Sequence, residues 1–272
     1  MRKFAYFGTP AVAAQTLAAL LAHGYAPSVV ITNPDAPRGR GMKLAPSPVK
    51  ALALEKGLPV LAPEQLDAVA LEEIKKHACD YAVVVAYGKL FPQALIESFP
   101  MGAINVHYSL LPRYRGASPV EAALLAGERE TGVTVQKLAL AMDAGDILAA
   151  REIPIAPEET ARELFPKLIA LGADLLVETL PKFEAGELAA AAQDESQATY
   201  SKKIKKEEGE LDLAGDALAN WNKYRAYLLR PGTYFIENGK RMKIAKASFA
   251  NGRFVVERIV PENGREIDYR SA

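Results

Sequence analysis

Three polar side chains carry chemistry that the rest of the chain does not offer. Asn105 and His107 stand two positions apart in the apolar run 103–107, whose composition is typical of a β-strand. Because side chains alternate across a strand, the amide and the imidazole project from the same face. They can therefore converge on one reacting atom, the amide as a neutral donor and the imidazole as a donor or base.

An imidazole in that role needs a carboxylate to orient it. Asp143 is the natural candidate, because it lies in the turn-forming stretch 142–146 and follows the strand-like run 132–135. An isolated histidine at a strand end is more often a hydrogen-bonded structural residue. On the residues alone, both interpretations stay open.

The elements that must position these groups alternate along the first part of the chain. We expect strands at 3–7, 27–32, 81–86 and 103–107, and helices at 11–23, from Pro48 with Ser47 as N-cap, and at 160–183. This alternation predicts βαβ units and an α/β fold with a doubly wound, Rossmann-like, mostly parallel sheet. Ligands of such sheets bind beyond the carboxyl ends of the strands, where the run 103–107 ends.

The composition changes after the long helix. Residues 187–206 pass from small to polar residues and end in a cluster of lysines, as a linker does. Short alternating apolar runs follow, separated by Asn-Gly pairs at 238–239 and 251–252, which are a strong hairpin signal. We therefore expect a large domain over 1–186, a linker over 187–206 and a small β-rich domain of the OB or barrel kind over 207–272.

Composition and motifs exclude several classes of function. Lys+Arg and Asp+Glu number 33 each, so the bulk charge gives no argument for nucleic-acid or membrane binding. The single cysteine, Cys79, excludes an internal disulfide framework, and we expect it to be a small core residue. The three histidines are far apart in sequence, so no metal is expected. Neither a complete dinucleotide-binding fingerprint nor a P-loop occurs, which disfavours nicotinamide and ATP chemistry.

No segment approaches the roughly 20 apolar residues that span a bilayer. The N-terminal stretch also lacks the apolar core of a signal peptide. We expect a cytoplasmic protein without membrane contact, and a monomer.

The stretch 105–116 resembles the active site of the folate-dependent formyltransferases. In that family an Asn, a His two residues later and an Asp in a Leu/Met-Asp-x-Gly turn move a formyl group from 10-formyltetrahydrofolate to an amine. The resemblance implies that Asn105, His107 and Asp143 are catalytic and that 10-formyltetrahydrofolate is the co-substrate. The folate contacts that it implies come from Ser109, Leu110, Leu111 and Pro112, and from the backbone of Ala86, Tyr87 and Gly88.

Further stretches are similar to the members of this family that act on a charged tRNA. The opening FGTP at 7–10 and the segments 198–200 and 230–233 match, so the resemblance covers the whole chain. The Gly/Pro-rich, cationic loop 33–44 is similar to their tRNA-reading insertion. The resemblance implies initiator methionyl-tRNA as the formyl acceptor, contacted by Arg38, Arg40 and Lys43.

Two features depart from the family pattern. Tyr108 stands where the family most often has Pro, beside the candidate catalytic histidine. The C-terminal domain is expected to be shortened, since few residues follow the stretch 247–249.

Three alternatives stay open. A sugar-amine N-formyltransferase would share the three polar groups and the formyl donor, but has no evident use for the loop 33–44. A hydrolase that splits formyl-folate with water would need neither that loop nor a second domain. A non-catalytic RNA-binding protein on the same scaffold would be expected to carry a basic net charge, which this chain lacks.

Overall fold

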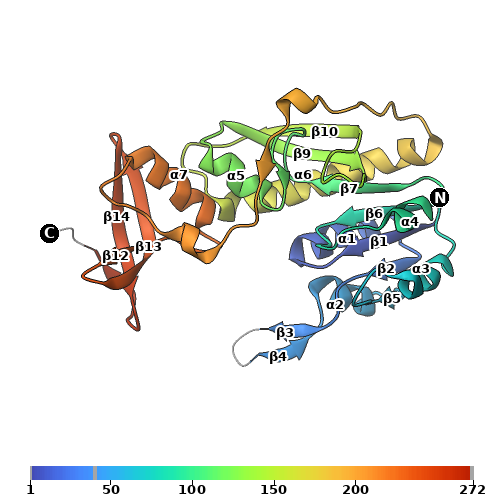
Figure 1. The fold of residues 1–272 in the computed structure, drawn as a ribbon, viewed down its shortest axis with the longest axis horizontal. Helices are drawn as coiled ribbons and strands as arrows, with labels where there is room; N and C mark the ends of the chain where they lie inside the picture. The colour runs from blue at the N-terminus through green and yellow to red at the C-terminus, as the bar shows by residue number, and fades with distance from the viewer. Residues whose placement is uncertain (1, 39–41, 270–272) are drawn as a thin grey trace. The chain divides into compact units, whose positions relative to one another are not determined.

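The computed structural model describes residues 2–38 and 42–269, and a seven-stranded sheet is its largest element (Figure 1). The strand order is β10-β9-β7-β6-β1-β2-β5. The strands are β1 (Phe4–Gly8), β2 (Val29–Ile31), β5 (Val60–Leu61), β6 (Tyr81–Val85), β7 (Ala103–His107), β9 (Glu130–Lys137) and β10 (Ile147–Pro154). The pairs β5–β2–β1–β6–β7 are parallel, and β9 is antiparallel to β7. The expected doubly wound, mostly parallel sheet is confirmed.

The helices lie between the strands in sequence, and local chemistry explains the start of one and the end of another. They are α1 (Ala11–Ala22), α2 (Pro48–Glu55), α3 (Ala68–Lys75), α4 (Gln93–Glu97), α5 (Pro119–Leu125), α6 (Ala161–Ala185) and α7 (Ala217–Tyr227), with 3₁₀ turns η1 (Glu195–Gln197) and η2 (Lys206–Gly209). The Ser47 hydroxyl caps α2 by accepting a 3.0 Å hydrogen bond from the backbone N–H of Lys50. Gly186, with φ of +72°, ends α6 in the left-handed conformation that glycine adopts without strain.

The core of the sheet lies around its central strands. All five residues of β6 are buried, as its unbroken apolar sequence predicts for a strand covered on both faces. Cys79 is 8% exposed and belongs to the same apolar cluster, so the expectation of a core cysteine is confirmed. Burial raises the pKa of its thiol to about 11, which keeps it protonated at neutral pH.

Strands β12 (Tyr234–Glu237), β13 (Lys240–Ala250), β14 (Arg253–Pro261) and β15 (Ile267–Asp268) form an antiparallel sheet in that order. The two Asn-Gly pairs make its first two turns, and all four of their residues have positive φ, as type I′ turns require. Trp221 of α7 stacks on Tyr224 and Phe249 with ring centroids 5.6 and 6.2 Å apart, and these rings belong to the apolar cluster under the sheet. A β-rich C-terminal part is thus confirmed, with α7 in its core.

The chain forms two compact units, each made of three segments that are separate in sequence. One comprises 1–113, 132–151 and 168–198, and the other comprises 114–131, 152–167 and 199–272. The second unit also contains the short parallel pair β8 (Arg115–Gly116) and β11 (Tyr200–Ser201). The linear division at 186 and 206 stays a prediction, because these units are interleaved along the chain.

Candidate active site

Strand β7 presents Asn105 and His107 side by side at the carboxyl end of the parallel part of the sheet. Asn105 stands opposite Gln136 of β9, and His107 opposite Thr134. Directly opposed residues share a face of the sheet, so these four polar side chains project from one face. Asn105 is 9% and His107 6% exposed, so both sit in the protein with little water around them.

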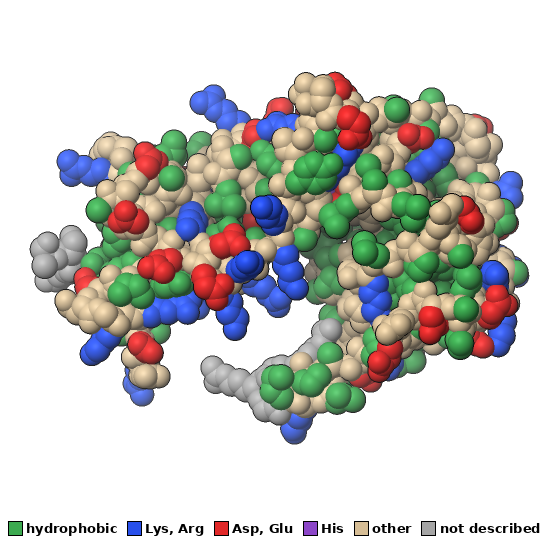
Figure 2. Space-filling view, viewed as in Figure 1, with side chains coloured by type: hydrophobic (Ala, Val, Ile, Leu, Met, Phe, Trp, Pro, Cys, Tyr) green, Lys and Arg blue, Asp and Glu red, His purple; other side chains and the backbone are tan. Residues whose placement is uncertain are grey.

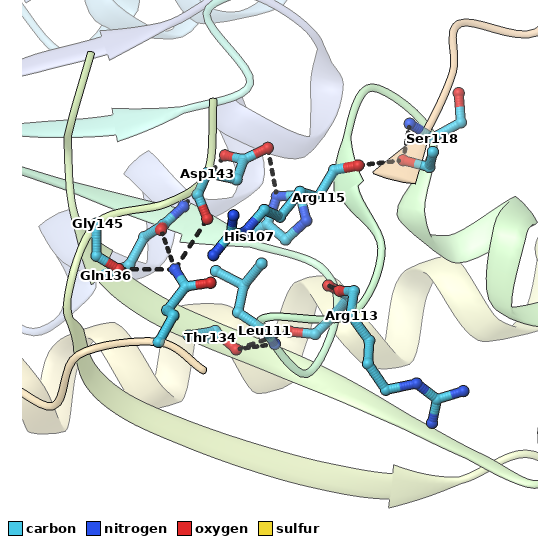
Figure 3. A network of polar contacts seen from close by, with 12 residues as sticks. His107, Leu111, Arg113, Arg115, Ser118, Thr134, Gln136, Asp143 and Gly145 are labelled. Carbon is cyan, nitrogen blue, oxygen red and sulfur yellow. Dashed lines mark hydrogen bonds and ion pairs between the residues drawn. The ribbon is translucent and has the colours of Figure 1, made fainter. Parts of the chain in front are cut away.

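Asp143 lies within reach of the histidine, as the sequence interpretation expects. Its Oδ2 is 3.6 Å from Nδ1 of His107, and the side chains are 15% and 7% exposed (Figure 3). The structure therefore brings all three candidate catalytic residues to one place. The sequence could identify the carboxylate of Asp143 as a candidate, but the pairing of β9 with β7 is what brings it close to His107.

The turn that carries Asp143 connects β9 to β10 and has a constrained backbone. Asp143 itself has φ of +52°, a conformation that costs a non-glycine residue roughly 1–3 kcal/mol unless its surroundings impose it. A Cβ added at Gly145 would overlap the carbonyl oxygen of Lys137, so only glycine fits there. The turn is closed by a 2.9 Å hydrogen bond from the Lys137 N–H to the Asp146 carbonyl oxygen.

Two glutamines that sequence analysis did not single out hold this turn. Gln136 Nε2 donates to Oδ1 of Asp143 at 3.1 Å, the carboxylate oxygen not facing His107 (Figure 3). Gln193 Nε2 donates to the carbonyl oxygens of Asp143 and Gly145 at 2.8 and 2.7 Å. The alternation of β9 could have revealed Gln136, because it shares the inward face with Thr134; Gln193 lies in the stretch interpreted as a linker and gave no signal.

The segment after β7, expected to contact folate, is held by Thr134. The Thr134 hydroxyl donates to the Ser109 carbonyl oxygen at 2.7 Å and accepts from the Leu111 N–H at 3.1 Å. Ser109 is fully buried, and its hydroxyl donates to the Arg113 carbonyl oxygen at 2.6 Å. Leu110 and Pro112 are partly exposed and Leu111 is buried. The folate contacts of this segment stay a prediction.

Tyr108, the departure from the family pattern, points away from His107 into the helical layer. A Cβ on Gly172, in the middle of α6, would stand 3.2 Å from the Tyr108 ring and 3.2 Å from Val106. Burial raises the pKa of the tyrosine to about 12. The bare backbone of Gly172 thus makes room for an aromatic ring that anchors the end of β7.

The other predicted folate segment follows β6. Ala86 and Gly88 are exposed and both have positive φ, while Tyr87 is buried with its ring edge against Phe7. The Tyr87 carbonyl oxygen accepts from Thr9 Oγ1, which follows β1, at 3.3 Å. The alternating exposure leaves the backbone on either side of Tyr87 accessible, as a ligand-lining role requires.

The prediction of an irregular loop around Arg38 and Lys43 is wrong, because the chain there forms a β-hairpin. Strands β3 (Ala36–Arg38) and β4 (Lys43–Ala45) pair antiparallel, with Arg38 opposite Lys43. Met42 and Leu44 are 70% and 73% exposed, and hydrophobic side chains are visible on this hairpin in Figure 2. Arg40 lies outside the described residues. Among its described side chains, the hairpin therefore exposes the cationic Lys43 beside the apolar Met42 and Leu44.

Within 2–38 and 42–269, no three His, Cys, Asp or Glu side chains cluster as metal ligands. None of the helices in those ranges is both long and apolar enough to cross a bilayer. Chemically, an amide, an imidazole and a carboxylate around one space can stabilise an oxyanion and move a proton, the two requirements of acyl transfer.

Comparison with known proteins finds one family over nearly the whole chain. The Formyl transferase family matches residues 2–180, and its C-terminal domain family matches residues 203–267. The methionyl-tRNA formyltransferase of Bdellovibrio bacteriovorus is 45% identical over 246 residues, which cover 89% of this chain and 77% of that protein.

Two solved structures share the fold. The methionyl-tRNA formyltransferase from Clostridium thermocellum aligns with a TM-score of 0.63 and 16% identity, over 99% of this chain and 100% of that one. An N-formyltransferase from Helicobacter canadensis, in complex with folinic acid and dTDP-3-aminofucose, aligns with a TM-score of 0.69 and 18% identity, over 98% of both chains. At these identities the likeness concerns the fold.

Proposed function

Because the chain belongs to the formyl transferase family, we propose that it moves the formyl group of 10-formyltetrahydrofolate to the α-amino group of methionine on initiator methionyl-tRNA. The observation that carries this proposal is the meeting of Asn105, His107 and Asp143 at the end of β7. Folate is the donor that the family resemblance implies, and the partly accessible backbone after β6 and β7 is where it would be held.

The reaction begins when the neutral methionine nitrogen attacks the formyl carbon, whose oxygen becomes an oxyanion in a tetrahedral intermediate. Asn105 donates a side-chain N–H to that oxygen without changing its protonation state. His107 donates a second hydrogen bond from the same face of β7. A pre-aimed donor of this kind contributes roughly 3–4 kcal/mol to the barrier reduction in comparable sites.

The intermediate collapses when the bond from the formyl carbon to folate nitrogen N10 breaks. The attacking amine gives up one proton and N10 takes one, so a group must carry it between them. We assign this transfer to Asp143, acting through a water molecule, and its Oδ2 lies 3.6 Å from Nδ1 of His107. The products are formylmethionyl-tRNA and tetrahydrofolate.

The acceptor is assigned from two observations. The 45% identity to a methionyl-tRNA formyltransferase extends over 89% of the chain. The β3–β4 hairpin carries exposed Met42, Lys43 and Leu44, a combination suited to an RNA end with its phosphates and bases. Arg38 and Arg40 add cationic residues to the same segment.

The test supplies the protein with formyl-folate and methionyl initiator tRNA, each alone and both together. We expect formylmethionyl-tRNA only when both are present. Release of formate from formyl-folate alone would indicate a hydrolase. Formylation of a nucleotide-linked amino sugar, with none of the tRNA, would indicate a sugar N-formyltransferase, and tRNA binding without any product would indicate a non-catalytic RNA-binding protein.

We further propose that the protein works in the cytoplasm, where its tRNA acceptor is made, and as a monomer. One chain supplies all three catalytic side chains from a single compact unit. Sedimentation of the free protein near 29.4 kDa checks the monomer; a stable dimer would contradict it.

A further inference from the structure

Residues 187–198, the first part of the expected linker, belong to the same compact unit as β7. Ala191 pairs with Ile147 through two backbone hydrogen bonds of 2.8 and 2.9 Å. Ile147 is the first residue of β10, directly after the turn that carries Asp143. The pairing therefore brings Gln193, two residues further on, to this turn.

The amide nitrogen of Gln193 is surrounded by oxygen acceptors. It lies 2.8 Å from the Asp143 carbonyl oxygen, 2.7 Å from that of Gly145 and 3.2 Å from Oε1 of Gln136. Only the NH₂ end of a carboxamide can face three acceptors, so the orientation of the Gln193 amide is determined.

The orientation of Gln193 in turn determines that of Gln136. Because Oε1 of Gln136 faces the Gln193 nitrogen, its own Nε2 faces Asp143 and donates to Oδ1 at 3.1 Å. If the Gln136 amide were reversed, its Oε1 would face Oδ1 of Asp143, and the two oxygens would repel each other. The Gln136 contact leaves Oδ2 of Asp143 directed at His107, 3.6 Å away (Figure 3).

We propose that Gln193 is a positioning residue for formyl transfer: its NH₂ group fixes the strained Asp143 backbone and, through Gln136, aims the Asp143 carboxylate at His107. The need for this support follows from the left-handed φ of +52° at Asp143. The inference rests on the proposed function, since it concerns the carboxylate assigned there to proton transfer. It makes the start of the linker part of the catalytic machinery.

The first test replaces Gln193 by Met in the full chain, which keeps the length of the side chain and removes its donors. We expect kcat for methionyl-tRNA formylation to fall about tenfold, while KM for both substrates changes less than about twofold. Gln197→Met is the matched control, because Gln197 is an exposed residue of the same segment, and its kcat should equal that of the wild type. Gln193→Asn keeps the amide but is one methylene shorter; as the second variant, it should lose the same activity.

The second test combines Gln193→Met with Asp143→Asn. If Gln193 acts through the carboxylate, adding the Met substitution to Asp143→Asn should change kcat less than about twofold. Tenfold losses in both backgrounds, or wild-type kcat in folded Gln193→Met and Gln193→Asn, would overturn the proposal. Failure of the wild-type protein to formylate methionyl-tRNA would overturn the proposed function instead, so the two failures are distinguishable.

Discussion

At the level of single residues, strand β7 and the turn between β9 and β10 supply different groups to the site. Asn105 and His107 share a direction because they are two positions apart on β7, a local property of extended backbone. Asp143 reaches them from a turn 36 positions after His107 in the chain, where Gln136 and Gln193 hold it. The two oxyanion donors therefore lie on a strand of the sheet, whereas the proton carrier lies on a turn that connects two other strands.

Substitution of Asn105 or of Asp143 tests the catalytic role assigned to each. Asn105→Ala removes an oxyanion donor and Asp143→Ala removes the proton carrier, so each should lower kcat at least about a hundredfold. Steady-state formylation kinetics measure the loss, and thermal melting checks that the fold is intact. Near-normal turnover in either folded variant would reject its role.

The elements decide how rigidly those residues are held. Tyr108 lies between His107 and Ser109 and places its ring in the space that Gly172 leaves on α6. Gly in a helix interior costs roughly 1 kcal/mol relative to Ala, which the buried ring contact offsets. The tyrosine is thus an alternative way to anchor the end of β7 at the position where the family that this stretch resembles most often has proline.

Restoring that proline should therefore harm this protein. Tyr108→Pro removes the buried ring and leaves a cavity beside Gly172, so we expect the free energy of unfolding to fall by about 3 kcal/mol. Urea denaturation measures it, and Tyr108→Phe, which keeps the ring, should stay within about 1 kcal/mol of the wild type. An unchanged stability of Tyr108→Pro would show that the ring contact is dispensable.

The β3–β4 hairpin is the element that we expect to meet RNA. Arg40→Ala should weaken binding of methionyl-tRNA and lower the slope of log K against log salt by about 1, since one phosphate contact is lost. Filter binding over a range of salt concentrations measures both quantities. Lys76→Ala, at an exposed lysine directly after α3, is the matched control; equal affinity and slope for the two variants would remove the hairpin from the RNA interface.

At the scale of the whole molecule, the C-terminal part packs against segments from the middle of the chain. Helix α7 packs on α5 within one compact unit. Trp221 Nε1 donates to the Pro157 carbonyl oxygen at 3.3 Å, and buried Arg225 donates to the Glu159 carbonyl oxygen at 3.2 Å. The residues after 206 therefore complete the core around α5 besides any role toward tRNA.

Truncation after Lys205 tests this interdependence. It would expose the buried face of α5, including Val120 and Leu124, and leave the Glu159 carbonyl without its arginine. We expect the melting temperature to fall by about 10 °C, as a loss of several kcal/mol produces in a chain of this size. Differential scanning calorimetry measures it. An unchanged melting temperature would mean that residues 1–205 fold independently.

Local patterns were sufficient for much of this protein. The strands β1, β2, β6 and β7, the helices α1, α2 and α6, the Ser47 cap and the Asn-Gly turns follow from residue types and periodicity, because each depends on neighbours a few positions away. The shared face of Asn105 and His107 follows in the same way. The family resemblance of the stretch 105–116 added the chemistry to expect there.

Tertiary structure decided everything that joins distant segments. The pairing of β9 with β7 places Asp143 at His107, the bridge between Ala191 and Ile147 places Gln193 at the same turn, and the approach of α6 gives Tyr108 its partner. It also turned the expected loop around Lys43 into a hairpin and interleaved the two compact units. Such contacts depend on the order of strands in the sheet and on the packing of layers. The side-chain repeats of a strand (2 residues) and of a helix (3.6 residues) identify single elements and do not specify which elements become neighbours.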